Sequence, residues 1–458
     1  MRACYVTTVG LLVATATLAQ DADALLKQMA DANAVQVVYR GGVPHTDRNG
    51  NLLATYDPDR SFFQIGVWGN PYGTIYGTDY DLKVLTDAGF NTMWPWPIGT
   101  FEQQLDAGRD AGLQVVYMGH LDAEAASRLK DHPSWLGNVW HDEPTGGFWG
   151  QDMEAKFQEF LDYKARISAA APGRPVFIND VPWVTAPATS WWAKWNTAGD
   201  VACHDNYPVM NRKHRARTLG DFESGSGIPT TTLLAAAVNG ESKPVWLIVG
   251  AFTTRGHGAF PFRFPTPMQL RAAVYAGLIH GATGIIYFCW DTYVCRDGEV
   301  MGMSPDPKIA YLEGGPNMPK PSPAKPMELA ESKALWMAAT SINREIAELT
   351  PSLLSPTVGE DVKYSVTTEG EPISASPLRC LLKPHPEGAY VLLTVNVDDT
   401  VMKATYEFPG GLASVQPMFE ERVAYDLTPA ATTFGDTYDP FEVHVYRVTP
   451  EEDAAAAG

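Results

Sequence analysis

The chain has 458 residues, of which 45% are hydrophobic, 11% aromatic and 19% charged. This composition is typical of globular proteins, and the length suffices for one large domain and a smaller one. The formal net charge of −19 argues against nucleic acid as a partner, because an acidic surface repels phosphates. Beyond the N-terminus no segment is apolar enough to cross a bilayer, so no membrane association is expected.

The N-terminal segment has the pattern of a secretory signal. Met1 and Arg2 precede an apolar stretch centred on Val9–Val13, and Ala19 is a suitable last residue before cleavage. The stretch is too short and too interrupted to span a membrane. We therefore expect residues 1–19 to be a signal peptide and the mature protein to be secreted or periplasmic; a buried N-terminal helix is the alternative.

Residues 20–61 are expected to form a helix and short strands that pack on the next domain. The predicted helix covers Asp21–Ala32, and the predicted strands cover Val35–Tyr39 and Leu52–Tyr56. Asp47-Arg48-Asn49-Gly50 predicts a turn between these strands.

From Phe62 onward, short apolar runs alternate with helical patterns. The predicted strands are Phe62–Trp68, Phe90–Trp94, Leu113–Met118, Trp135–His141, Pro175–Asn179, Asp200–His204, Pro244–Val249 and Gly284–Trp290. The clearest predicted helices are Asp79–Ala88, Phe101–Ala111, Ala123–Leu129, Met153–Ala171, Met268–His280 and Met327–Leu349. Eight strand–helix units predict an α/β fold, a (β/α)8 TIM barrel over residues 62–350.

The pattern changes after Thr350. Strand-like runs separated by turn residues cover Val362–Thr367, Leu378–Leu382, Tyr390–Val397, Ala404–Phe408 and Phe441–Val448. They predict that residues 351–458 form a small C-terminal all-β sandwich domain.

The most informative motif is His141-Asp142-Glu143-Pro144, which ends the fourth predicted strand. Two adjacent carboxylates there contribute little to folding, because desolvating them costs several kcal/mol unless they are paired. In barrel enzymes the catalytic groups lie at the carboxyl ends of the strands. The motif therefore marks a candidate active site.

An exported barrel with this motif, an aromatic-rich mouth and a C-terminal β-sandwich resembles the clan A glycoside hydrolases over roughly residues 62–450. The resemblance implies that Glu143 is the general acid and that Asp142 matches the residue that binds the sugar 2-hydroxyl. It also implies sugar-binding roles for Tyr207 after strand six and for Trp290 after strand eight.

The chain departs from that family at strand seven, where the family has a nucleophilic Glu. Here the strand contains no carboxylate. The candidate partners of Glu143 are Asp205 first, Asp291 second and Asp180 third, and each has a structural role as its alternative. A carboxyl separation of about 6.5–9.5 Å predicts inversion and about 5–5.5 Å retention. The empty strand-seven position favours inversion.

Aromatic residues gather at the predicted strand ends. Indole rings stack on the C–H faces of sugars, and the alternative is that these rings fill the barrel core. His120 and His141 are additional candidates for bonding hydroxyl groups. The predicted substrate-binding set is Trp68, Trp96, His120, Trp140, Asp142, Tyr207, Trp290 and Arg212, with Trp94 and Trp183 as further aromatic candidates.

A basic rim is predicted after strands six and seven. It comprises Arg212, Arg215, Arg255, His257 and Arg263. Such a rim would favour an anionic sugar, and the alternative is a set of solvated loops.

No metal and no cofactor are expected. His120, His141, His204 and Asp205 contain metal ligands, but no pair has the helix spacing of a zincin. The cysteines match no zinc pattern; Cys289 and Cys295 could form a disulfide, with buried thiols as the alternative.

These features predict a secreted glycoside hydrolase that acts on a poly- or oligosaccharide. Two other classes stay open. One is a carbohydrate-binding protein on a degenerate barrel, which the empty strand-seven position would explain. The other is a polysaccharide lyase with Tyr207 and His120 as base and acid.

Overall fold

A computed structural model gives the fold. It describes residues 39, 41–70, 73–75, 78–96, 99–182, 188–209, 219, 227–256, 261–290, 292–295, 298–306, 322–358, 364–374, 377–386, 388–428 and 430–451. The predicted signal peptide and the predicted helix after it lie outside these residues, as does the predicted strand Val35–Tyr39 except for Tyr39. Within the described residues, no helix is both long enough and apolar enough to span a membrane.

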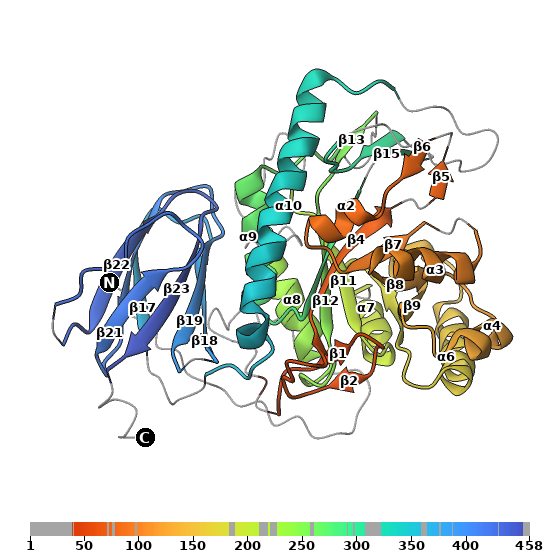
Figure 1. Cartoon of the computed structure of the whole chain (residues 1–458), viewed down its shortest axis with the longest axis horizontal. Coiled ribbons are helices and arrows are strands. Elements are labelled where there is room, and N and C mark those ends of the chain that lie inside the picture. The colour runs from red at the N-terminus through yellow and green to blue at the C-terminus, as the bar shows by residue number, and fades with distance from the viewer. Residues whose placement is uncertain are drawn as a thin grey trace.

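Eight parallel strands close into a barrel, which confirms the predicted fold class (Figure 1). Each strand pairs with its neighbour in sequence, and the eighth pairs with the first. Every predicted barrel strand is present, and no strand end is shifted by more than two residues. The strands are β4 (Gln64–Asn70), β7 (Thr92–Pro95), β8 (Gln114–Met118), β9 (Trp135–Asp142), β10 (Val176–Asn179), β11 (Ala202–Asn206), β12 (Val245–Gly250) and β14 (Gly284–Phe288).

Helices surround the barrel and connect its strands. They are α2 (Lys83–Asp87), α3 (Phe101–Ala111), α4 (Ala123–Leu129), α5 (Pro144–Gly147), α6 (Met153–Ala170), α7 (Ala188–Ala198), α8 (Ile228–Ala237), α9 (Pro267–Ile279) and α10 (Pro326–Leu353). Local signals fix several ends: Thr100 and Gln103 form a capping box at α3, and Thr266 and Gln269 form one at α9.

Small sheets lie at the two ends of the barrel (Figure 1). At one end lies a sheet of β1 (His45–Asp47), β2 (Leu52–Leu53) and β3 (Ser61–Phe62). Arg174, two residues before the strand β10, donates to the Asn49 carbonyl at 2.7 Å and joins this sheet to the barrel. At the other end lie the hairpin of β5 (Gly73–Ile75) and β6 (Thr78–Tyr80), and the sheet of β13 (Thr253–Arg255), β16 (Gly298–Met301) and β15 (Thr292–Cys295).

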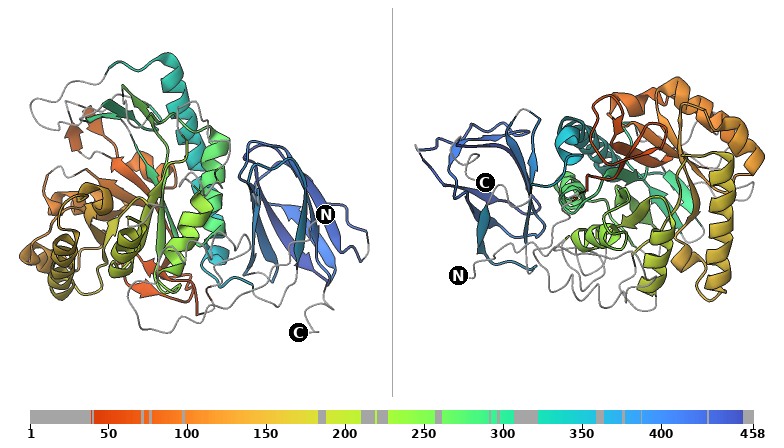
Figure 2. Two further views of the ribbon diagram at one scale, coloured as in Figure 1. Left: turned by 180° about the vertical axis from the view of Figure 1, so that it is seen from behind. Right: turned by 90° about the horizontal axis from the view of Figure 1, so that it is seen from below.

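Two antiparallel sheets form the C-terminal sandwich, shown in blue beside α9 and α10 (Figures 1 and 2). The first contains β17 (Ser365–Gly370), β20 (Met402–Glu407) and β22 (Thr433–Tyr438). The second contains β18 (Leu378–Pro384), β19 (Tyr390–Asn396), β23 (Val443–Pro450) and β21 (Leu412–Pro417). Arg271 of α9 pairs with Glu345 of α10 at 3.0 Å and donates to the Val443 carbonyl at 2.8 Å, which links the barrel helices to the sandwich.

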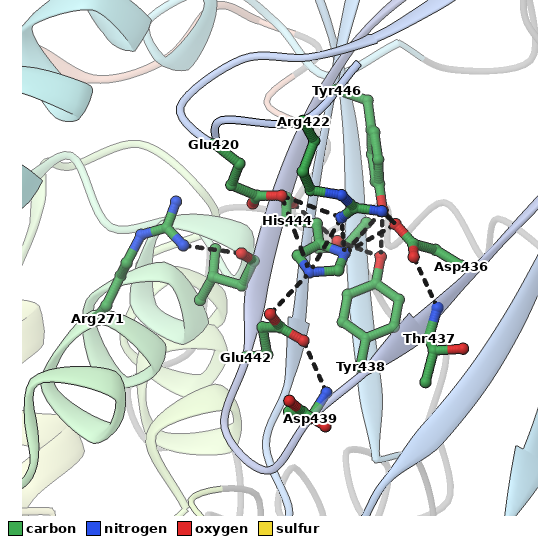
Figure 3. A network of polar contacts seen from close by, with 12 residues as sticks. Arg271, Glu420, Arg422, Asp436, Thr437, Tyr438, Asp439, Glu442, His444 and Tyr446 are labelled. Carbon is green, nitrogen blue, oxygen red and sulfur yellow. Dashed lines mark hydrogen bonds and ion pairs between the residues drawn. The ribbon is translucent and has the colours of Figure 1, made fainter. Parts of the chain in front are cut away.

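An ionic network lies in the sandwich, with the buried His444 of β23 at its centre (Figure 3). His444 lies 3.0 Å from the Asp436 carboxylate and 3.2 Å from that of Glu442. Arg422 also pairs with Asp436, at 2.5 Å. Because His444 is buried, removing its carboxylate partners would leave a buried charge unpaired, which is costly.

The barrel interior is filled by aromatic and aliphatic side chains. Trp68 and Trp94 stack with their ring centroids 4.9 Å apart, and Trp94 meets Phe177 and Trp246 edge to face. The barrel is therefore a packed core, and any site must lie at its ends.

Candidate active site

Glu143 has a strained backbone at the carboxyl end of β9. Its φ and ψ are 50° and 54°, in the left-handed region that residues other than glycine rarely adopt. The Glu143 N–H donates to the Asn179 carbonyl at 2.7 Å, and Pro144 begins the single-turn helix α5 directly afterwards. Such strain is typical of functional sites, where the surrounding structure holds it in place.

Asp180, the third candidate partner, anchors this strained turn. Its carboxylate accepts hydrogen bonds from the backbone N–H of Thr145, at 3.3 Å, and from the Thr145 hydroxyl. Asp180 is fully buried, and Trp192 donates to its carbonyl at 3.0 Å. The structure therefore places Asp180 behind Glu143, where it holds the turn and no ligand can reach it.

Asp205, the first candidate partner, lies against Glu143. It belongs to β11 and is only 1% exposed. Its Oδ1 accepts a hydrogen bond from Asn179 at 2.9 Å, and its carboxyl group lies within hydrogen-bonding reach of that of Glu143 once one of the two carries a proton. No N–H donates to Asp205 Oδ2 within the described structure, so the proton of Glu143 is the donor suited to this buried oxygen.

The electrostatics of the pair keep a proton on Glu143. The charge of Asp205 raises the pKa of Glu143 to about 8, and burial and their mutual hydrogen bond act in the same direction. Burial and the charge of Asp142 raise the pKa of Asp205 to about 7, while hydrogen bonds from Asn179 and Glu143 oppose the shift. The two acids titrate as a coupled pair, in which Glu143 retains its proton to higher pH than Asp205 does.

Asp142 is the most exposed residue of the cluster. Water reaches this residue, yet protein surrounds the carboxyl group at the barrel end, and this desolvation raises the pKa of Asp142 to about 7. The charge of Glu143 adds to the shift, and a 2.9 Å hydrogen bond from Asn179 opposes it. Glu143 is half-buried, so Asp142 and Glu143 are the two members of the cluster open to a ligand.

The close contact of Glu143 with Asp205 bears on the expected stereochemistry. Inversion needs about 6.5–9.5 Å between two carboxyl groups to admit a water molecule. Two carboxyl groups that share a hydrogen bond leave no such room. Inversion by this particular pair therefore does not fit the structure.

Strand seven, β12, ends in Gly250, and none of its residues carries a carboxylate. The inward-facing residues of this strand are Trp246 and Ile248, so Gly250 continues the inward row at the mouth. A Cβ atom at Gly250 would lie 3.0 Å from Cδ1 of Tyr207. The Tyr207 ring therefore packs tightly against the carboxyl end of strand seven.

Four of the six tryptophans predicted at the barrel mouth are packed in the protein, and one of them is Trp94, which is 0% exposed in the barrel core. Trp140 is 3% exposed and faces the helices, where it packs on Phe160 and Trp195, because alternate strand residues point to opposite faces. Trp68 is 2% exposed in the barrel core, and Trp290 is 4% exposed beside Trp336 of α10. Their rings have no face free for a sugar, which corrects the prediction of an open mouth built from them.

Trp96, Tyr207 and His120 stay accessible. Trp96 and Tyr207 are half-buried, and the Tyr207 ring stacks on Phe288 with centroids 5.6 Å apart. His120 is exposed and follows β8. His141 is half-buried, and its Nδ1 lies 2.6 Å from the Asp142 carbonyl, so its ring is tied to the backbone.

Several predicted residues lie outside the described part of the chain. They are Asp291, the second candidate partner, together with Trp183, Arg212, Arg215 and His257. Two other members of the predicted basic rim are engaged: Arg255 pairs with Glu299 at 3.1 Å, and Arg263 donates to Gln269 at 3.1 Å. The side chain of Cys295 is also undescribed, so its disulfide with Cys289 stays a prediction.

Asn179 is the member of the cluster that the sequence analysis missed. Its amide nitrogen donates to Asp142 Oδ1 and to Asp205 Oδ1, both at 2.9 Å. The signal was available, because Asn179 follows the inward-facing Phe177 by two positions on a predicted strand. Among the side chains that the structure describes, no group of three or more His, Cys, Asp or Glu residues could hold a metal ion.

Comparisons with known proteins find solved structures of similar fold. No family model matches the chain, and no curated protein matches it. Similar solved structures include a glycoside hydrolase family 5 protein from Bacteroides vulgatus, with 12% identity and a TM-score of 0.47 over 90% of this chain and 95% of that one. An Anoxybacillus α-amylase has 11% identity and a TM-score of 0.45 over 85% and 98%.

A β-galactosidase from the psychrophilic Marinomonas ef1 has 11% identity and a TM-score of 0.43 over 63% of this chain. The chain spans only 61% of that protein's length. At these identities and scores the likenesses concern the fold alone.

Proposed function

We propose that the protein is a glycoside hydrolase with Glu143 as its general acid. One observation carries this proposal: Glu143 is held in a strained conformation at the barrel end, against the buried Asp205 and beside the exposed Asp142. Cleaving a glycosidic bond requires a carboxylic acid that is still protonated near neutral pH and a carboxylate close to the anomeric carbon. The cluster contains both.

Each acid has a distinct role in this proposal. Glu143 protonates the leaving-group oxygen, because it carries the proton and a ligand can reach it. Asp205 is buried, so it acts on Glu143 by keeping the pKa of that acid raised. Asp142, ionised and open to the mouth, stabilises the positive charge that develops at the anomeric carbon.

The substrate is proposed to be a poly- or oligosaccharide held by the accessible residues of the mouth. Trp96 and Tyr207 offer aromatic surface for the C–H faces of sugar rings, and His120 offers a ring nitrogen for a hydroxyl group. Arg212 stays a candidate ligand for an anionic sugar. Export of the protein, through the predicted signal at residues 1–19, also stays part of the proposal.

The proposal is tested by incubating the full-length mature protein with a panel of polysaccharides and aryl glycosides. Release of reducing sugar or aryl alcohol is expected, with activity lost in Glu143→Gln. Binding without turnover by both proteins would instead favour a carbohydrate-binding role. Unsaturated products, detected by their ultraviolet absorbance, would indicate a lyase and overturn the assignment of Glu143.

A further inference from the structure

Asn179 lies at the centre of the carboxyl cluster because of strand register. It pairs with Asp142 of β9 on one side and with Cys203 of β11 on the other. Cys203 and Asp205 lie two residues apart on β11, so both point into the barrel with Asn179. One side chain on β10 therefore reaches acids on both neighbouring strands.

The two ends of the Asn179 amide make different contacts. The amide nitrogen donates to Asp142 Oδ1 and Asp205 Oδ1, which uses both of its N–H bonds. The carbonyl oxygen accepts from the thiol Sγ of Cys203 at 3.6 Å. Because the pKa of this buried thiol is raised well above its usual range, the thiol keeps its proton and can donate. The contact with Cys203 therefore fixes which way the amide faces.

We propose that Asn179, oriented by Cys203, is a positioning residue that keeps the proton of the carboxyl cluster on Glu143. Its N–H groups bind the ionised forms of Asp142 and Asp205, which leaves Glu143 as the group that retains the proton. The inference rests on the proposed function for its catalytic meaning, but the placement of the proton is a property of the protein alone.

The titratable groups of the cluster around Asn179 are four carboxyl groups and one thiol. Asp142 and Glu143 come from the end of β9, Asp180 from the end of β10, and Asp205 and Cys203 from β11. Both hydrogen bonds from Asn179 lower the pKa of their acceptors. Removing them raises the pKa values of Asp142 and Asp205, and a neutral Asp205 no longer raises the pKa of Glu143.

The test compares Asn179→Leu with Asn206→Leu. Asn206 is the matched control, because it is also buried on the barrel wall but faces outward and donates to Thr231 of α8 at 3.0 Å. The first readout is a ¹³C NMR titration of carboxyl-labelled Asp and Glu in the protein without substrate. We expect Asn179→Leu to raise the titration midpoints of two Asp residues by about one unit and to lower that of Glu143. The control should leave all three unchanged.

A second readout is the pH dependence of kcat/KM on an activated aryl glycoside. In Asn179→Leu we expect the acidic limb of the profile to shift to higher pH and the basic limb to shift to lower pH. KM should change by less than about twofold. If Asn179→Leu does not fold, Cys203→Ala should narrow the profile in part, while Cys203→Ser, which keeps a donor, should not. Unchanged midpoints in Asn179→Leu, or identical profiles for the two Cys203 variants, would overturn the inference. If the protein hydrolyses no glycoside, the proposed function fails, and the NMR titration still decides the placement of the proton.

Discussion

The ring of Tyr207 fills the space beside Gly250, so that a Cβ atom at Gly250 would lie 3.0 Å from Tyr207 Cδ1 and 3.3 Å from a ring carbon of Phe252. Strand seven therefore ends without a carboxylate, and a side chain added at Gly250 would press on two aromatic rings. The substrate mouth has an aromatic wall at this place, formed by Tyr207, Phe252, Phe262 and Phe288.

Gly250→Ala should destabilise the protein by about 1–3 kcal/mol, because the added methyl group displaces packed rings. In a Tyr207→Ala background the same change should cost less, with a coupling of about 0.5–3 kcal/mol between the sites. Urea unfolding of the four proteins gives this cycle. Gly41→Ala is the control, because no atom lies within 4 Å of a Cβ at Gly41. Additive effects of the two substitutions would show that Tyr207 does not occupy this space in solution.

Activity should be greatest between about pH 7 and 8. Asp142, with its pKa raised to about 7, must lose its proton, so activity rises as pH increases through this value. Glu143, with its pKa raised to about 8, must keep its proton, so activity falls as pH increases further. The profile of kcat/KM against pH measures both limbs. An optimum below about pH 5, as for unshifted carboxyl groups, would contradict these assignments.

Thr145→Val should destabilise the fold by about 1–3 kcal/mol, because it leaves the buried Asp180 carboxylate without its hydroxyl donor. It should also lower kcat more than it changes KM, since this contact anchors the turn that carries Glu143. Thr145→Ser keeps the hydroxyl group and is the matched control. Equal kcat values for the Val and Ser variants would show that the contact between Thr145 and Asp180 does not position the turn that carries Glu143.

The sandwich network should make stability depend on pH through two groups. Burial opposes the charged form of His444, but its contacts with Asp436, Glu420 and Glu442 prevail and raise its pKa. This contribution is complete below the unfolded pKa of about 6.5 and is lost as pH rises through the folded value. Burial likewise opposes the charge of Asp436, yet hydrogen bonds from His444, Tyr425, Tyr446 and Arg422 lower its pKa, so that contribution is lost in acid.

Thermal unfolding of the wild type and His444→Gln across pH 5–9 measures the first of these contributions. The difference in melting temperature between the two proteins should shrink as pH rises above about 6.5. A difference that is constant over this range would show that His444 is uncharged in the folded sandwich.

The barrel was predictable because its signals are local. Strands buried on both faces are continuous apolar runs, and the capping residues Thr100 and Gln103 mark the observed N-terminal end of α3. The helices α7 and α8 were missed: α8 is buried on nearly every side, so it has no polar face to give a helical period. The strands β21 and β22 were also missed, and both carry exposed residues within short alternating stretches.

The site was only half predictable. The motif identified Glu143, and its sequence position after β9 was correct, but its left-handed backbone depends on the anchoring of Thr145 by Asp180. Asp205 was expected to follow strand six, and the structure places it inside β11, where it is buried. The direction of Trp140 depended on a strand register that adjacent aromatic and polar residues left ambiguous.

The central claim is that Glu143 donates the proton to the leaving group. The most direct measurement is kcat/KM for the wild type and Glu143→Gln on aryl glycosides whose phenol leaving groups span a range of acidity. If Glu143 is the general acid, Glu143→Gln should lose about 10²–10⁴-fold in kcat/KM on poor leaving groups, and this loss should shrink toward nothing as the phenol becomes acidic enough to leave unaided. A loss of the same size on every phenol, or no loss at all, would contradict it.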